Sequence, residues 1–417
     1  MDATVAERRK SRKYDILLLG ATGYTGSLTA EYIARHLPTD LKWAIAGRSR
    51  SKLEALAKKL NAIDSKRSQP VIEVVSLENG TQLDSAIKDC KVCISVVSYH
   101  QIGETVVRSC IENGTDYLDV AGDVPLLRKF VDKYHEAAIN ARVALIHVCG
   151  VFSAPHDLLT WATVRKLAEE TSLRAKEVVL SVTELELSPS GGTAQSLMAD
   201  STHDPQALEQ AKQPWILSPI KGTQTSESTN FLGIRQESSI GLLSASSISA
   251  GQNRAVVHRT WGLLQGTNQE YGPNFQFNEY EKVSSTAAGL LRMLNTSLLN
   301  TLLGFKLFRS IAKLFLPAPG EGPDVEKTRY SRVKFEAVAI ADVNDGSVPP
   351  RAYASFSYPS GAYHTTALFL AQGAASLLYT RSLEGRIAGG CLTPAFLGDD
   401  LIRWVQEAGA TFKVNLI

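Results

Sequence analysis

The feature that most constrains the fold is a glycine-rich turn that follows an apolar strand directly. The chain reads DILLL over residues 15–19, then GATGYTG over residues 20–26, and helix-like sequence begins at about Thr25. Here Gly20 permits the tight turn, Gly23 lets the backbone approach a pyrophosphate, and Gly26 lets the helix pack closely on the strand. Glycines that serve only a turn are the less favoured alternative. The sequence therefore predicts a dinucleotide site lined by Gly20, Thr22, Gly23, Tyr24, Thr25 and Gly26.

The first 150 residues alternate strand-like and helix-like segments. Apolar runs at 15–20, 43–47, 71–76, 92–97, 115–122 and 142–150 are separated by segments with helical character. Strands that alternate with helices at this spacing form a parallel sheet covered on both faces. We therefore expect an α/β fold whose residues 14–150 make a Rossmann-type, doubly wound domain.

The rhythm changes after Gly150. Long alternating stretches at 175–187, 332–343 and 352–358 are typical of antiparallel strands with one solvated face. They predict a second, α+β domain over residues 151–383, which contains a Gln-, Ser-, Thr- and Pro-rich loop at 204–230. Residues 384–417 are expected to return to the first domain, and the basic residues 1–13 are expected to be a flexible start.

In a dinucleotide-binding domain, the residues at the end of the second strand contact the adenosine ribose of the cofactor. NAD sites usually carry a carboxylate there, whereas an arginine accommodates a 2′-phosphate. This tip reads GRSRSK over residues 47–52. Arg48, assisted by Ser49 and Lys52, therefore favours NADP(H), because a guanidinium pairs with phosphate in a bidentate manner. For Arg50 and Lys52, capping or solvating the following helix is an equal alternative.

The nicotinamide end should lie over the carboxyl ends of the later strands. The side chains gathered there by the sequence are Tyr99, His100, Asp119, Asp123, Ser153, His156 and Asp157. Any of them could relay a proton, and our candidates for the catalytic role are Tyr99, His100 and Asp123. The alternatives are structural: Asp157 could cap a helix, and Asp119 and Asp123 could hold backbone turns.

Composition excludes some classes of function. The formal net charge of +2, with 21% charged residues, gives no field that argues for nucleic acid. Five scattered cysteines and the lack of an apolar leader predict a reducing, cytoplasmic setting. Cys90 and Cys93 form a single C-x-x-C inside an apolar run, so we predict core thiols and no metal site. The short-chain dehydrogenase motif Tyr-x-x-x-Lys matches only at Tyr330 and Lys334, outside the nucleotide domain.

Residues 288–316 form an apolar segment with an amphipathic pattern. Its longest uncharged run covers residues 293–305, too short for the roughly 20 residues that cross a bilayer. A helix buried in the core or at a subunit interface is the favoured interpretation. The alternative is a basic interfacial helix that contacts a membrane or a lipid droplet.

The motifs together resemble the saccharopine dehydrogenase-like oxidoreductases, and within them the trans-acting enoyl reductases. The resemblance runs over nearly the whole chain: GATGYTG, AGRS-x-x-KL, GTDYLDVAGD (114–123), CG-x-x-S-x-P-x-D (149–157), SGGT (190–193), PGEGP (319–323) and GGCLTPA (389–395). Two positions depart from the family pattern. Val97 and Ser98 stand where Gly-Pro is common, and Asp123 stands where glutamate is usual; both lie near the expected active site.

The resemblance implies a Rossmann domain, NADP(H), and an inserted domain for substrate and for dimerisation, hence a homodimer. It also places Asp119 beside the nicotinamide end. The implied reaction is NADPH-dependent reduction of an α,β-unsaturated acyl thioester held on a polyketide synthase carrier domain. One alternative is a saccharopine-type imine reductase, which would need an arginine cluster for several carboxylates. The other is a non-catalytic NADP-binding protein of lipid surfaces.

Overall fold

The computed structural model describes residues 11–417 except 77–79, 187, 201, 224–227, 319 and 344–345. The predicted flexible start therefore lies almost entirely outside the described residues. At its end, Arg12 donates to the backbone oxygens of Lys88 and Asn113, and Lys13 Nζ lies 2.5 Å from an oxygen of Asp89.

The first sheet is parallel throughout and has seven strands in the order β13-β6-β5-β4-β1-β2-β3. The strands are β1 (Tyr14–Leu19), β2 (Trp43–Gly47), β3 (Val71–Val74), β4 (Cys90–Ser95), β5 (Asp116–Asp119), β6 (Ala144–Ile146) and β13 (Gly390–Leu392). The strand order reverses between β1 and β4, which is where doubly wound folds bind their ligands. The Rossmann-type sheet predicted from the sequence is confirmed.

Helices cover both faces of this sheet. Side chains alternate along β1, so Ile16 and Leu18 join one core while Leu17 and Leu19 join the other. The first face carries α2 (Tyr24–His36), α3 (Arg50–Ile63) and α14 (Ala362–Tyr379), and the second carries α4 (Gly80–Lys88), α5 (Glu104–Asn113) and α6 (Val124–Ala141). All five cysteines are buried free thiols.

The second sheet also has seven strands, in the order β14-β12-β11-β7-β10-β9-β8. They are β7 (Ala175–Glu184), β8 (Ile234–Glu237), β9 (Gly241–Ser244), β10 (Gln276–Lys282), β11 (Val333–Ala341), β12 (Arg351–Tyr358) and β14 (Thr411–Leu416). The sheet is mixed and not purely antiparallel as expected, because β7 and β10 pair in parallel. The long excursion between these two strands lets the chain re-enter the sheet in the same direction.

That excursion holds α8 (Gly191–Asp200), α9 (Pro205–Ala211) and α10 (Ala250–Leu263). Helix α9 lies inside the segment predicted as a loop. It forms because Asp204 caps its amino end by accepting the Gln206 N–H, and Pro205 fits its first turn. After β10 come α11 (Thr286–Gly304), α12 (Lys306–Ala312) and α13 (Val325–Arg329).

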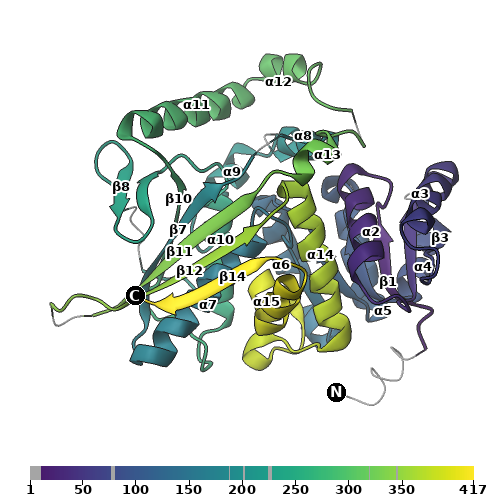
Figure 1. The fold of residues 1–417 in the computed structure, drawn as a ribbon, viewed down its shortest axis with the longest axis horizontal. Helices are drawn as coiled ribbons and strands as arrows, with labels where there is room; N and C mark the ends of the chain where they lie inside the picture. Colours follow the sequence, from purple (N-terminus) through teal and green to yellow (C-terminus); the bar gives the residue numbers. More distant parts are fainter. Residues whose placement is uncertain are drawn as a thin grey trace.

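The two sheets share one continuous hydrophobic core. Helices α7 (Ala154–Thr171) and α14 contribute side chains to it together with strands of both sheets, and Figure 1 shows α14 beside α2. The last segment divides between the sheets: β13 joins the first, α15 (Gly398–Glu407) packs on α14, and β14 joins the second. The expected domain limits stay a prediction.

Candidate active site

The glycine turn joins β1 to α2 in the geometry that its sequence predicts. Gly20 has a φ of +87°, a left-handed conformation that favours glycine. A Cβ on Gly26 would lie 2.2 Å from the Gly20 carbonyl oxygen, so only glycine allows this close crossing of helix and turn. Gly23 caps α2, and its N–H donates to Gly20 O at 3.0 Å.

The same turn fits the phosphates of a dinucleotide. Tyr24, Thr25 and Gly26 form the first turn of α2, and their N–H groups have no acceptor among the described residues. Free N–H groups and the positive end of the helix dipole are what a pyrophosphate needs. The side chain of Thr22, in the glycine turn, approaches the last residue of β2: its Oγ1 lies 3.6 Å from the position of a Cβ built on Gly47.

The tip of β2 presents exposed cations. Arg48 is exposed, and neither Arg48 nor Lys52 has an ion-pair partner within the described part of the chain. Ser49 caps α3 by accepting the Lys52 N–H, and its hydroxyl lies 3.2 Å from that of Ser51. Arg50 instead faces Glu54 at 4.0 Å, one helical turn away. Arg48 is thus free to meet a 2′-phosphate, whereas Arg50 is engaged along α3.

Tyr24 also connects the glycine turn to the second half of the chain. Its hydroxyl donates to Pro323 O at 2.7 Å, and its ring meets the ring of Tyr363 edge-on with centroids 4.9 Å apart. Gly322 packs directly on the Tyr24 ring, where a Cβ would lie 2.6 Å from ring carbons. The PGEGP and SGGT motifs meet here, because the Gly191 N–H donates to Glu321 O at 2.9 Å. These contacts place the amino end of α8 beside the nucleotide turn.

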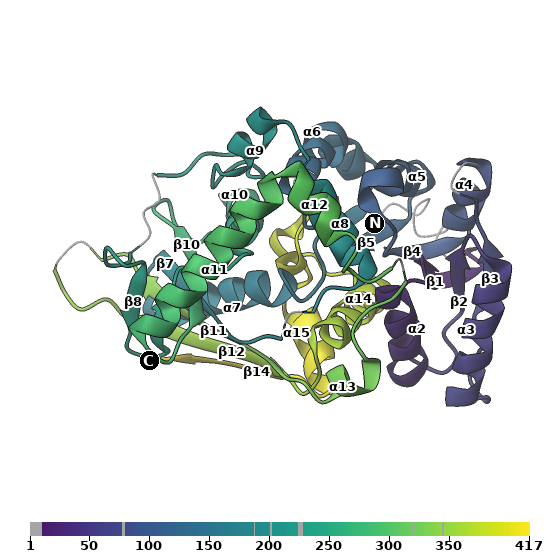
Figure 2. The same ribbon diagram turned by 90° about the horizontal axis from the view of Figure 1, so that it is seen from above.

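The carboxyl end of α8 completes a cluster of four titratable side chains, which we call the His/Asp cluster: His100, Asp123, Asp200 and His203. Their ligand-type atoms all lie within 4.8 Å of one another. His100 Nε2 is 2.7 Å from Asp200 Oδ1 and 3.4 Å from Asp123 Oδ2, and His203 Nε2 is 2.5 Å from Asp123 Oδ2. Figure 2 shows α8 beside the ends of β4 and β5, where the nicotinamide end was expected.

Local structure explains how each member is held. His100 lies in a single π-type turn, η1 (Tyr99–Gly103), that continues into α5. Asp123 caps α6, since its Oδ1 accepts the Leu126 N–H at 2.9 Å and leaves Oδ2 for the two imidazoles. The ring of Tyr99 packs against that of His100 at a tilt of 45°, with centroids 4.6 Å apart, and burial raises the pKa of Tyr99. The structure thus gathers all three predicted catalytic residues.

The electrostatics of the cluster favour a shared proton. Burial, together with repulsion from Asp123, raises the pKa of Asp200 to about 8. Burial also lowers the pKa of His100, although Asp123 opposes the shift. A carboxylic acid that keeps its proton at neutral pH, 2.7 Å from a neutral imidazole, is an arrangement suited to general acid chemistry.

The same side chains are also ligand types for a divalent cation. Two imidazoles and two carboxylates could surround an ion such as Zn²⁺ in a tetrahedral arrangement. The contacts of 2.5 and 2.7 Å between them are, however, hydrogen-bond distances, and a tetrahedral shell would need these pairs to separate. We therefore interpret the cluster as hydrogen-bonded acids and bases.

Asp119 and its neighbours form a buried support under this edge of the sheet. Asp119 Oδ2 lies 2.8 Å from His147 Nδ1, and Oδ1 accepts the N–H groups of Ala121 and Val148. Burial lowers the pKa of His147, but the Asp119 carboxylate, its hydrogen bond and Cys391 together outweigh burial and raise the pKa to about 10. Both oxygens of Asp119 are therefore occupied by protein groups, and its predicted cofactor contact stays a prediction.

The remaining candidates lie deeper. Ser153 Oγ donates to Asn253 Oδ1 at 2.7 Å and accepts the Gln252 amide at 2.8 Å, which holds Gln252 over Gly122. His156 is 1% exposed and packs against the ring of Phe335. Asp157 accepts bonds from Thr260 Oγ1 and the Ala395 N–H, tying α7 to the carboxyl-terminal segment. These residues make structural contacts, but Asp157 does not cap a helix as its structural alternative proposed, because it lies inside α7, whose N-cap is Ser153.

Sequence reasoning missed Asp200 and His203. They lie about 80 to 100 residues after the strand ends that they approach, and the stretch ADSTHD carries no recognised motif. The one feature that could have drawn attention is the density of polar groups in this stretch, which begins six residues after the end of SGGT.

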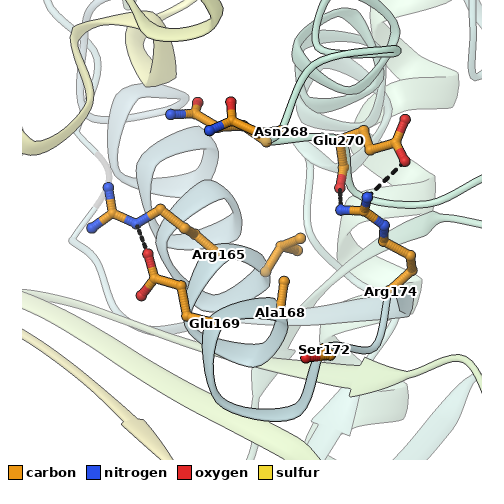
Figure 3. Close-up of a pocket in the computed structure, with 9 residues that line it drawn as sticks. Arg165, Ala168, Glu169, Ser172, Arg174, Asn268 and Glu270 are labelled. Atoms are coloured by element: carbon orange, nitrogen blue, oxygen red, sulfur yellow. Dashed lines mark hydrogen bonds and ion pairs between the residues drawn. The ribbon is translucent and has the colours of Figure 1, made fainter.

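A pocket of about 480 Å³ lies elsewhere, on the carboxyl-terminal half of α7 (Figure 3). Ala168 in its wall is 14 residues beyond Ala154, which puts it about 21 Å along the helix from the end of α7 that adjoins the site. Its charged walls are satisfied in pairs: Arg174 with Glu270 at 2.8 Å, and Arg165 with Glu169 at 3.3 Å. We assign it no role in the chemistry.

The fold and the glycine turn define a dinucleotide-binding oxidoreductase architecture. Comparison with known proteins makes the class specific: residues 16–146 match the saccharopine dehydrogenase NADP binding domain. NADP(H) is therefore the cofactor of this domain, and the chain is an NADP-binding oxidoreductase with a saccharopine dehydrogenase-like nucleotide domain.

Proteins that are similar to this chain over nearly its whole length have names that specify a reaction. A putative trans-acting enoyl reductase of Mycobacterium tuberculosis is 27% identical over 97% of this chain and 98% of its own. A trans-acting enoyl reductase of Mycobacterium ulcerans is 26% identical, with the same shares of both chains covered. Saccharopine dehydrogenase (L-Glu forming) from Saccharomyces cerevisiae has the same fold, with a TM-score of 0.50 and 14% identity over 97% of this chain and 100% of that one. The resemblance indicated by the motifs is confirmed.

Proposed function

We propose that the chain is an NADPH-dependent enoyl reductase that reduces α,β-unsaturated acyl thioesters presented on a carrier domain of a polyketide or lipid synthase. The observation that carries the proposal is the His/Asp cluster, which holds a protonated acid at the carboxyl edge of the nucleotide-binding sheet. The names of the relatives support the same reaction.

NADPH, held by the glycine turn and Arg48, would supply a hydride for the β-carbon of the unsaturated thioester. The chain must then deliver a proton to the α-carbon. Asp200 holds that proton and donates it to the α-carbon, and His100, 2.7 Å away, is the partner through which Asp200 regains a proton from solvent. Asp123 fixes both histidines, because its Oδ2 faces each of them. After transfer, the cluster carries one proton fewer and regains it from water.

The charge of the cluster argues against a saccharopine-type imine as substrate. That substrate carries several carboxylates, which the carboxylate of Asp123 at the reaction end would repel. A neutral enoyl thioester meets no such repulsion. The non-catalytic alternative predicts tight NADPH binding without turnover, so it can be separated by experiment.

The test is oxidation of NADPH with a panel of thioesters, from crotonyl to long-chain enoyl, on both coenzyme A and pantetheine-loaded carrier protein. We expect turnover with at least one enoyl carrier and none with lysine plus a 2-oxo acid. Binding of NADPH without turnover on any enoyl thioester would refute the proposed activity. Turnover only with the amino acid mixture would support the imine alternative.

The matched variant is Asp200→Asn, which keeps the shape and loses the acid. We expect kcat to fall about 100-fold or more, with the Kd for NADPH unchanged. The wild-type rate should decline as the pH rises above about 8, since the protonated form of Asp200 is the active one. A variant with undiminished kcat would remove Asp200 from the mechanism.

A further inference from the structure

Helices α11 and α12 form an apolar ridge on the outside of the molecule. Figures 1 and 2 show the two helices as an arch beyond the second sheet; we call residues 286–315 the α11–α12 ridge. Of the 20 large apolar side chains exposed in the described part of the chain, nine lie here, so they form a patch and are not scattered. They are Leu291, Leu294, Leu298, Leu299, Phe305, Leu307, Ile311, Leu314 and Phe315.

The ridge contacts the body of the protein along a narrow stripe. Gly289, Met293 and Thr296 repeat at spacings of four and three residues, which places them on one side of α11. Thr296 Oγ1 donates to Ser246 O at 3.2 Å, and Gly289 is the only buried residue of the helix. The leucines on the other sides are left in solvent. Leu307 on α12 and Leu314 just beyond its end are more exposed still, at 74% and 80%.

The charge of the ridge has one sign. From Thr286 to Ala318 the chain has four basic residues and no acidic one. Arg292 faces Glu281 at 3.3 Å, and Arg309 donates to the Leu303 carbonyl at 2.7 Å. Lys306 and Lys313 are exposed, and neither has an ion-pair partner in the described ranges. Exposed apolar side chains beside lysines without ion-pair partners are complementary to a lipid bilayer, whose interior is apolar and whose headgroups can be anionic.

We infer that the α11–α12 ridge binds the surface of an anionic lipid bilayer, with both helices lying in the interfacial plane. No helix in the part of the chain that the structure describes is long and apolar enough to cross a membrane. A second copy of this chain suits the ridge less well, because a twofold contact would place Lys306 and Lys313 against the same two lysines of the other copy. The inference does not depend on the proposed reductase activity.

The ridge leads directly to the nucleotide turn. In the chain after α12, Pro317 and Ala318 lie against Gly191 at the start of α8, and Gly322 and Pro323 contact Tyr24.

The experiment is co-sedimentation of the full chain with vesicles of phosphatidylcholine alone and of an equimolar mixture of phosphatidylserine and phosphatidylcholine. We expect binding to the anionic vesicles and at least tenfold less to the neutral ones. Replacing three exposed leucines together, Leu298→Ser, Leu307→Ser and Leu314→Ser, should lower binding at least tenfold. Lys306→Gln with Lys313→Gln should lower it about fivefold per lysine and weaken its dependence on salt.

The matched control is Val348→Ser, on the turn between β11 and β12, where the side chain is 89% exposed. It should bind vesicles like the wild type, and NADPH binding by every variant would show that each is folded. The inference is overturned if neither vesicle binds, if both bind equally, or if the triple serine variant binds like the wild type. It is also overturned if the leucines only drive a concentration-dependent dimer in sedimentation analysis, or only affect binding to an acidic carrier protein.

Discussion

At the scale of single residues, the site depends on side chains whose surroundings set their chemistry. Sequence placed Tyr99, His100 and Asp123 at strand ends, and the structure gathers them. It could not place Asp200 and His203, because their approach depends on how α8 crosses between the two sheets. Nor could it foresee that Asp119 would be occupied by His147 and by backbone N–H groups.

The raised pKa of Asp200 predicts a pH effect on stability. The carboxyl titrates at about 8 in the folded chain, against a usual value of 3.8. The folded state binds this proton more tightly, so its contribution favours folding at low pH and is lost as the pH rises from about 4 to about 8. Asp200→Asn should therefore reduce the fall in Tm across this window. The control is Glu209→Gln, at an exposed ion pair with Lys212, which should leave the dependence of Tm on pH unchanged. The raised pKa of Asp200 would be contradicted if Tm depended on pH in the same way in Asp200→Asn and in the wild type.

Arg48 predicts the choice between the two nicotinamide cofactors. Arg48→Ala should weaken NADPH binding about 10- to 100-fold, because a charged hydrogen-bonded pair with the 2′-phosphate is lost. NADH, which lacks this phosphate, should bind about as before. Calorimetric titration of both cofactors measures the difference, and Arg50→Ala, whose side chain faces Glu54, is the matched control. Equal losses for NADPH and NADH would refute the role of Arg48.

At the scale of elements, local patterns predicted the strands of the first sheet well. Each of β1 to β6 is an apolar run bounded by turn or helix sequence, so its identity is encoded within a few residues. The parallel pairing of β7 with β10 was not predictable in this way, since it depends on where a chain returns after some 90 residues. The short α9 was masked by the polar composition around its cap at Asp204.

The β1–α2 turn predicts that two neighbouring glycines differ in role. Gly26→Ala should destabilise the fold by about 1–3 kcal/mol or more, since its Cβ would meet the Gly20 carbonyl at 2.2 Å. Gly23 has a φ of −75° and its Cβ would lie 3.3 Å from the same oxygen, so Gly23→Ala should fold with little loss. It should nevertheless bind NADPH about tenfold more weakly, by crowding the pyrophosphate. Unfolding by denaturant measures the effect on stability, and titration with NADPH measures the effect on binding. Equal stability of the Gly26→Ala and Gly23→Ala variants would contradict the packing argument.

At the scale of the whole molecule, the two sheets are joined through one core, and the site lies where the joining elements meet the nucleotide domain. The glycine turn, His100 and Asp123 come from the first 150 residues, whereas Asp200 and His203 come from the excursion between β7 and β10. Sequence predicted both halves and their order. The assembly of the site depends on long-range packing of α8 and α14, which no local pattern records.

The central claim is that this assembly transfers hydride to an enoyl thioester and supplies the matching proton from the His/Asp cluster. The most direct measurement uses NADPH deuterated at the transferable position, an enoyl thioester, and mass spectrometry of the acyl product. We predict one deuterium at the β-carbon and one solvent-derived hydrogen at the α-carbon, with product formed at least about 100-fold more slowly by Asp200→Asn. Absence of a saturated product from any enoyl thioester, while NADPH binds, would contradict the account.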